Sequence, residues 1–222
     1  KDLRWQIQKD VVILLTFKHI FSDGVSHENL EDDLESLIIN LESKKEWLHS
    51  QKINDLIEFF DSLGDSWKNS NEYLGNNLKH ISEFLSRANL EKELKISLRG
   101  NFLVLDEFIS LFDIPDSLYH AQPRGLSVHW IAGNVDVLGI FSVVQSLLTK
   151  NLCFIKAPHD YLLLKKLLLS FKDVSTKKIS GQDLLNCITL VYVERDDLIN
   201  QEILSKNADI RIAWGGDEAV ST

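Results

Sequence analysis

The sequence predicts an α/β fold in which a parallel sheet follows a mostly helical N-terminal region. Three observations support this prediction. Between residues 126 and 213, short apolar runs typical of strands alternate with longer runs at helical spacing. The strand-like runs lack clean polar alternation, which is typical of parallel strands covered on both faces. Residues 1 to about 95 instead repeat apolar side chains at helical spacing. With right-handed crossovers, the second part becomes a Rossmann-like sheet.

The N-terminal region is expected to be mostly helical, with interruptions at Ser22-Asp23-Gly24 and at Gly64. Ser26 is a plausible start for a helix whose apolar stripe runs from Leu30 to Leu41. The expected helical segments are 3–15, 26–41, 53–63, 78–86 and 90–98.

Residues 96–122 leave two alternatives open. The apolar residues on either side of Arg99-Gly100-Asn101 are compatible with a hairpin or with a helix-loop-helix. Residues 122–125, read as QPRG, then form a turn that leads into the first strand of the sheet.

The stretch 125–158 predicts a βαβ unit. A strand at 126–131, a helix at 137–148 and a strand at 152–156 fit the roughly 30 residues that such a unit needs. Asn134 and Lys156 follow or end its two strands. Parallel sheets bind ligands outside the carboxyl ends of their strands, so these positions are candidates for chemistry.

The rest of the chain continues the alternation. We expect helices at 161–171 and 198–205, strands at 188–193 and 210–213, and a loop around 177–181. The predicted organisation is a helical region at 1–120 and an incomplete Rossmann-like cofactor-binding domain at 121–222.

Composition excludes several classes of protein. A net charge of −9 over 222 residues argues against a nucleic-acid-binding surface. No apolar run approaches the roughly 20 residues that span a bilayer. The two cysteines, Cys153 and Cys187, lie in apolar strand-like runs and indicate reduced thiols in a cytoplasmic protein.

The sequence contains no G-x-G-x-x-G fingerprint after the first strand, no phosphate-binding P-loop and no zinc-ligand spacing. The candidates are therefore the strand ends. Lys156 could hold a ribose hydroxyl or a phosphate, and Gly215-Gly216 could let backbone approach a pyrophosphate. Asn134 could donate to a developing oxyanion. Taken singly, these residues are better explained as a solvated lysine, a tight turn and a helix N-cap. Their joint placement at one edge of the sheet gives the functional interpretation about equal weight.

Three segments resemble the LuxC-type acyl-CoA (acyl-thioester) reductases, a branch of the aldehyde dehydrogenase superfamily. They read GLSVHWIAGNV at 125–135, SVVQSLLTKN at 142–151 and AWGGDEAV at 213–220. The resemblance is dense over 121–222 and weaker over 1–120. It implies an aldehyde dehydrogenase-like cofactor domain and NADPH-dependent reduction of a long-chain acyl thioester to the aldehyde, through an acyl-cysteine intermediate.

Carried over by position, Asn134 matches the oxyanion-hole Asn of the superfamily's Trp-Asn-Phe-Pro motif. Lys156 matches the Lys that binds the adenosine ribose. Trp214 and Gly216 match the Phe and Gly of the Phe-Thr-Gly-Ser turn beside the cofactor. The segment departs from that motif at Val135-Asp136, where most members have Phe-Pro.

A second departure bears on cofactor choice. His159 stands where NAD-preferring members often carry Glu, whose charge would repel a 2′-phosphate. Lys156 with His159 would accept that phosphate, which favours NADPH.

The nucleophilic cysteine of the family is expected beyond this sequence, because Cys153 and Cys187 are interpreted as core residues. The piece alone is then expected to be inactive. The alternative is a truncated or diverged, non-catalytic module that serves as a binding or scaffold protein. The resemblance also implies acyl-transferase and acyl-protein synthetase partner subunits, and we expect a homo-oligomer.

Overall fold

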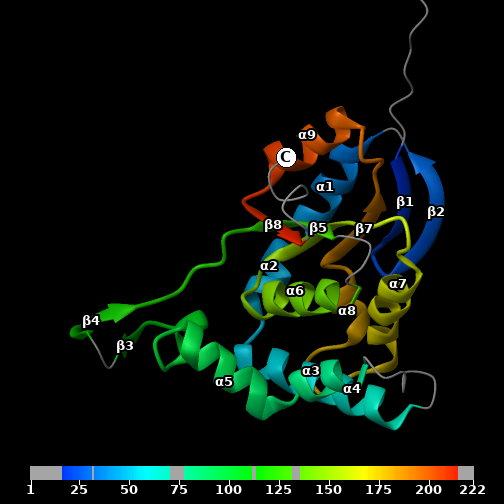
Figure 1. Cartoon of the computed structure of the whole chain (residues 1–222). Helices are drawn as coiled ribbons and strands as arrows, with labels where there is room; N and C mark the ends of the chain where they lie inside the picture. Colours follow the sequence, from blue (N-terminus) through cyan, green and yellow to red (C-terminus); the bar gives the residue numbers. More distant parts are fainter. Residues whose placement is uncertain (1–16, 32, 71–77, 112–113, 132–135, 215–222) are drawn as a thin grey trace, which may run out of the picture.

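In the computed structural model, one sheet lies between two layers of helices, with a further group of helices beyond one of them (Figure 1). The structure describes residues 17–31, 33–70, 78–111, 114–131 and 136–214. Asn134, Gly215, Gly216 and the predicted helix at 3–15 lie outside these residues.

The predicted parallel sheet is confirmed. Its strands are β5 (Leu126–Ile131), β6 (Leu152–Lys156), β7 (Ile188–Tyr192) and β8 (Ile210–Trp214). They lie in the order β7-β6-β5-β8, and each neighbouring pair is parallel. Of these four strands, β5 comes first in the sequence and lies between β6 and β8. The chain continues from β5 to β6 and then to β7 on one side, and β8 pairs with the other side of β5. This is the 3-2-1-4 order of a Rossmann fold.

The helical prediction for residues 17–31 is wrong. They form a hairpin, β1 (Phe17–Ser22) and β2 (Val25–Glu31), and β1 pairs antiparallel with β7. The turn uses left-handed backbone at Asp23 and Gly24, as tight hairpins prefer. Ser26 therefore starts no helix. Strands from both parts of the chain share one sheet, and the division near residue 120 stays a prediction.

Helices cover both faces of the sheet. α1 (Leu34–Glu42) and α9 (Leu198–Asn207) contact one face, while α6 (Asp136–Leu148) and α7 (Leu162–Leu169) cover the other. Asp33 caps α1 by accepting a hydrogen bond from the Ser36 backbone N–H. The helix predicted at 161–171 ends in a 3-10 turn, η2 (Ser170–Asp173).

A short helix, α8 (Gly181–Leu185), begins within the predicted loop. Ser180 and Asp183 form a reciprocal capping box at its start. Gly181 packs so closely under the Phe171 carbonyl that an added Cβ would lie 1.6 Å from the oxygen.

The remaining helices are α2 (Lys45–Ser50), α3 (Ile53–Asn69), α4 (Leu78–Phe84) and α5 (Arg87–Ser97), and α3 and α4 both contact α6. The predicted end of a helix at Gly64 is wrong, because α3 continues to Asn69. A Cβ at Gly64 would lie 2.9 Å from the Ser82 carbonyl and 3.0 Å from the Leu85 Cβ. The glycine therefore permits close packing of α3 against α4 and does not end the helix.

Of the two alternatives for residues 96–122, the helical one describes the segment around Arg99 better, because α5 is followed there by the 3-10 turn η1 (Phe102–Leu105). A hairpin comes later, as β3 (Ile109–Leu111) and β4 (Ile114–Tyr119). Figure 1 shows this hairpin projecting away from the main sheet.

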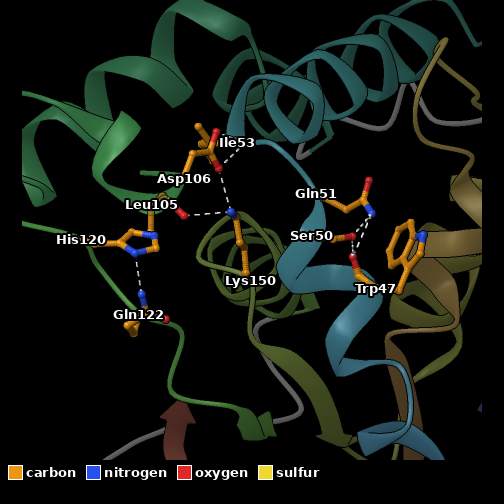
Figure 2. Close-up of polar contacts among 9 residues, drawn as sticks. All are labelled: Trp47, Ser50, Gln51, Ile53, Leu105, Asp106, His120, Gln122 and Lys150. Carbon is orange, nitrogen blue, oxygen red and sulfur yellow. Dashed lines mark hydrogen bonds and ion pairs between the residues drawn. The ribbon is translucent and has the colours of Figure 1, made fainter. Parts of the chain in front are cut away.

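An ion pair joins the α2–α5 helical group to the sheet layer (Figure 2). The Lys150 ammonium, just after α6, lies 2.7 Å from Asp106 Oδ1 and donates to the Leu105 carbonyl at 2.8 Å. Asp106 also accepts from the Ile53 backbone N–H at 3.1 Å, which satisfies a free donor at the start of α3. One pair therefore fixes the ends of three elements.

Candidate functional site

The carboxyl ends of the parallel strands line up at one edge of the sheet. Lys156, the last residue of β6, pairs in register with Trp130 of β5 on one side and Val191 of β7 on the other. Trp214 ends β8 and pairs with Ile131. Lys156 and Trp214 are thus on the same edge but separated by β5.

Lys156 is half-buried at this edge, and burial lowers the pKa of its ammonium below the usual lysine range. The nearby Glu194 carboxylate acts in the opposite direction, and Arg195 adds to the lowering. Among the residues that the structure describes, no hydrogen bond or ion pair involves the Lys156 ammonium. A partly desolvated cation at the end of a parallel strand is suited to bind an anionic or hydroxyl-bearing ligand.

Tyr192, the last residue of β7, holds a carboxylate beside this lysine. Its hydroxyl donates to Glu194 Oε2 at 2.7 Å. Because this bond favours the neutral phenol, it raises the pKa of Tyr192 to about 12, with smaller contributions from burial and from the charges of Glu194 and Asp196. The phenol therefore stays a hydrogen-bond donor throughout the physiological range.

His159 is exposed in the segment between β6 and α7, and its ring packs edge-on against Tyr192, with centroids 5.9 Å apart and planes at 89°. The structure therefore brings two of the predicted site residues, Lys156 and His159, to the ends of the neighbouring strands β6 and β7. Their roles in binding a cofactor stay predictions.

The hairpin adds a second lysine to this region. Lys18 of β1 pairs in register with Tyr192, and its ammonium donates to the hydroxyl of Tyr161. The same ammonium lies 5.2 Å from the centroid of the Tyr161 ring. Because β1 runs antiparallel to β7, the start of β1 lies beside the end of β7.

Trp214 has a buried indole nitrogen, Nε1, with no hydrogen-bond partner among the described residues. The indole N–H is a donor only, and a buried unsatisfied donor is costly. Trp214 adjoins Gly215 and Gly216, which lie outside the described residues, as does Asn134. The predicted contributions of these three residues therefore stay predictions.

Beneath the edge, a buried histidine connects β5 to α6. His129 Nδ1 is 2.7 Å from Ser142 Oγ, and its Nε2 is 2.9 Å from Ser127 Oγ and 3.4 Å from Ser146 Oγ. Burial lowers the pKa of His129 to about 3, so the imidazole is neutral. This polar network supports the βαβ unit from inside.

Cys153 and Cys187 are both free and buried, in agreement with their interpretation as core residues. Burial raises the pKa of the Cys153 thiol to about 12, and burial also raises that of Cys187. A nucleophile at neutral pH needs a lowered pKa, so neither thiol is suited to covalent catalysis.

Over the described ranges, no group of three or more His, Cys, Asp or Glu side chains could hold a metal ion. Within the same residues, no helix is both long and apolar enough to cross a membrane.

Sequence reasoning missed Lys18, Tyr192 and Glu194. Glu194 follows from the rule that already selected Lys156, because it comes directly after the strand predicted at 188–193. Tyr192 lies one residue before the predicted end of that strand and is the last residue of β7. Lys18 could not be found in this way, because its segment was predicted to be helical and its strand partner lies far along the chain.

Comparison with known proteins adds a family, relatives and a fold. The family model of acyl-CoA reductase (LuxC) matches residues 48–222. Long-chain acyl-protein thioester reductase of Aliivibrio fischeri is 30% identical over 189 residues, covering 76% of this chain and 38% of that protein. Long-chain acyl-protein thioester reductase 2 of Photobacterium leiognathi is 28% identical over 211 residues, covering 86% of this chain and 42% of that protein. The chain thus spans less than half the length of these relatives.

Among solved structures, that of 3,6-anhydro-L-galactose dehydrogenase in complex with NAP is similar, with a TM-score of 0.50 and 13% identity. The match covers 88% of this chain and 47% of that one. At this identity the likeness shows a shared fold.

Proposed function

Because the chain belongs to the acyl-CoA reductase (LuxC) family, we propose that the full-length protein reduces a long-chain fatty acyl thioester to the aldehyde with NADPH. The acyl donor is an acyl-CoA or an acylated protein. The names of the relatives, long-chain acyl-protein thioester reductases, support the acyl chemistry. The acyl group is transferred first to a cysteine other than Cys153 and Cys187, supplied by residues beyond this sequence.

The position of the Lys156 ammonium is the observation that supports binding of a dinucleotide cofactor. The ammonium is half-buried, has no partner among the described residues and lies at the carboxyl end of a Rossmann-ordered sheet. This donor fits the ribose hydroxyls or the 2′-phosphate of a dinucleotide. The neighbouring Glu194 carboxylate fits a ribose hydroxyl as an acceptor. The structure of 3,6-anhydro-L-galactose dehydrogenase, which has a similar fold, was solved in complex with NAP, and this supports a nicotinamide cofactor.

When bound, such a cofactor supplies the hydride for reduction of the acyl group. The residues of this chain bind and orient it. Lys156 and His159 bind the adenosine end of the cofactor. Because position 159 carries no carboxylate, a 2′-phosphate is not repelled there. Trp214, Gly215 and Gly216 contact the cofactor at the end of β8, and Asn134 donates its amide to the oxyanion of the acyl group.

Three further proposals concern the surroundings of the enzyme. We expect acyl-transferase and acyl-protein synthetase subunits as partners that deliver the acyl group. We also expect a homo-oligomer. Two exposed apolar side chains at the β3–β4 hairpin support a contact between copies there: Phe108 beside the hairpin is 68% exposed, and Leu118 within it is 66% exposed. The free cysteines Cys153 and Cys187 support a cytoplasmic location.

The proposal is tested by titrating full-length protein with NADPH and then labelling its thiols in the presence of an acyl-CoA. We expect saturable cofactor binding, and protection of one cysteine outside this sequence by acylation. A protein that binds no cofactor and forms no acyl-cysteine would support the alternative of a non-catalytic binding or scaffold module.

A further inference from the structure

We propose that Tyr192 determines the cofactor preference of this site: by holding the Glu194 carboxylate, its hydroxyl keeps the Lys156 ammonium free to bind a 2′-phosphate. The inference rests on the proposed function, since it assumes that a dinucleotide binds at this edge of the sheet. It adds two residues, Tyr192 and Glu194, that the resemblance did not supply.

The first support comes from strand register. Lys156 pairs with Val191, and paired residues of neighbouring strands project to the same face of the sheet. Tyr192 is the next residue and therefore projects to the opposite face. That face is the one covered by α7. Tyr192 packs against His159, which precedes α7, and pairs in register with Lys18. Lys18 in turn donates a hydrogen bond to Tyr161 at the start of α7.

The second support is the position of the carboxylate. Glu194 follows β7 by two residues and binds the Tyr192 hydroxyl at 2.7 Å. It is near enough to Lys156 to influence the pKa of that lysine, but no ion pair joins the two side chains. The hydroxyl thus holds the Glu194 carboxylate on the α7 side, away from the face to which Lys156 projects.

The hydrogen bond from Tyr192 to Glu194 matters for cofactor binding because of the charges at this edge of the sheet. A Glu194 side chain released from Tyr192 would pair with Lys156, which has no other partner among the described residues. A 2′-phosphate would then have to displace a carboxylate, and the two anions would repel each other. A cofactor without the 2′-phosphate would lose much less, because Glu194 can accept a hydrogen bond from its ribose. Arg195 is an additional cation near Lys156 and is unchanged in all the variants below.

The test measures equilibrium binding to the full-length protein and does not depend on turnover. Adenosine 2′,5′-bisphosphate and adenosine 5′-monophosphate report on the 2′-phosphate alone, and NADPH and NADH report on the whole cofactor. The proteins compared are the wild type, Tyr192→Phe, Glu194→Gln and the double variant. Tyr119→Phe, on the projecting hairpin, is the control for loss of a phenol hydroxyl.

We expect Tyr192→Phe to weaken binding of the bisphosphate and of NADPH about tenfold, the size expected for one hydrogen bond to a charged group. Binding of the monophosphate and NADH should change less than about twofold. Glu194→Gln should bind the bisphosphate at least as tightly as the wild type. The double variant should match Glu194→Gln, because the hydroxyl has no carboxylate left to restrain.

Other results overturn the inference. Equal weakening of phosphorylated and unphosphorylated ligands by Tyr192→Phe, no weakening, or a double variant as weak as Tyr192→Phe would each exclude the restraint while leaving the proposed function standing. A folded wild-type protein that binds neither NADPH nor NADH would remove the proposed function and this inference together. Circular dichroism of each variant establishes that it is folded.

Discussion

Lys150 and Asp106 form an ion pair whose side chains are only 4% and 7% exposed. Buried pairs contribute little net stability over well-packed apolar residues, but removing one partner leaves a buried charge uncompensated. Here the cost extends to α3, because Asp106 also holds the Ile53 N–H (Figure 2).

We therefore predict that Lys150→Met lowers the free energy of unfolding by about 3–5 kcal/mol. Urea unfolding followed by circular dichroism measures the loss. The matched control is Lys206→Met, which removes a highly exposed i,i+4 pair with Glu202 and should cost at most about 0.5 kcal/mol. Similar losses in both variants would show that burial does not set the strength of the Lys150 pair.

The βαβ unit could be predicted from sequence because its signals are local. The run at 126–131 coincides with β5, and the apolar runs around 137–148 and 152–156 coincide with α6 and β6. Each of these elements buries at least one face, so the apolar residues that predict it all lie within the element itself.

The hairpin at 17–31 could not be predicted in the same way. Phe17, Ile20 and Phe21 are all buried, and their spacing fits a helix as well as a bulged strand. The strand forms because β7, more than 160 residues later, offers it an edge. Tertiary pairing thus overrides the local pattern.

The helix α8 was missed for a different reason. Its signal, the capping box formed by Ser180 and Asp183, is local and readable. The neighbouring residues Lys177, Lys178 and Gly181 instead predict a loop. Of the site, Lys156 and His159 could be placed near a strand end from sequence, whereas Lys18 reaches Tyr161 and Tyr192 only through the hairpin.

A second prediction concerns pH. His129 has a pKa of about 3 in the folded protein and about 6.5 when unfolded. As the pH falls through this window, the unfolded state takes up a proton that the folded state does not. The stability contributed by neutral His129 is complete above pH 6.5 and is lost towards pH 3, by up to about 1.4 kcal/mol per pH unit.

His129→Asn retains polar groups near the serines but cannot titrate in this range, so its stability should decline less steeply below pH 6.5 than that of the wild type. His19, whose pKa burial lowers to about 4, keeps part of the dependence in both proteins. Denaturant unfolding over a pH series measures the slopes. His80→Asn, at an exposed histidine, is the control and should keep the wild-type slope. An unchanged slope in His129→Asn would refute the assignment.

A third prediction concerns thiol reactivity. Cys153 and Cys187 should resist alkylation in the native full-length protein near neutral pH, because both thiols are buried and their pKa values are raised. Both should react fully in guanidinium chloride. Peptide mapping by mass spectrometry gives the extent of modification at each position. Rapid native labelling of Cys153 would mean that the sheet opens locally or that this thiol is activated.

The last prediction concerns His159 and cofactor preference. Replacing it by Glu places a second carboxylate next to the Tyr192–Glu194 pair, where it would repel a 2′-phosphate but could accept a hydrogen bond from an unphosphorylated ribose. Like charges about 4 Å apart cost roughly 1–4 kcal/mol at a partly exposed site, so preference should shift towards NADH by about tenfold or more. Dissociation constants for NADPH and NADH in His159→Glu and wild type measure the shift. His80→Glu, at an exposed histidine of α4, makes the same change of residue type and should leave the ratio unaltered. Equal loss of affinity for both cofactors would mean that His159 supports the fold of this edge and does not discriminate the phosphate.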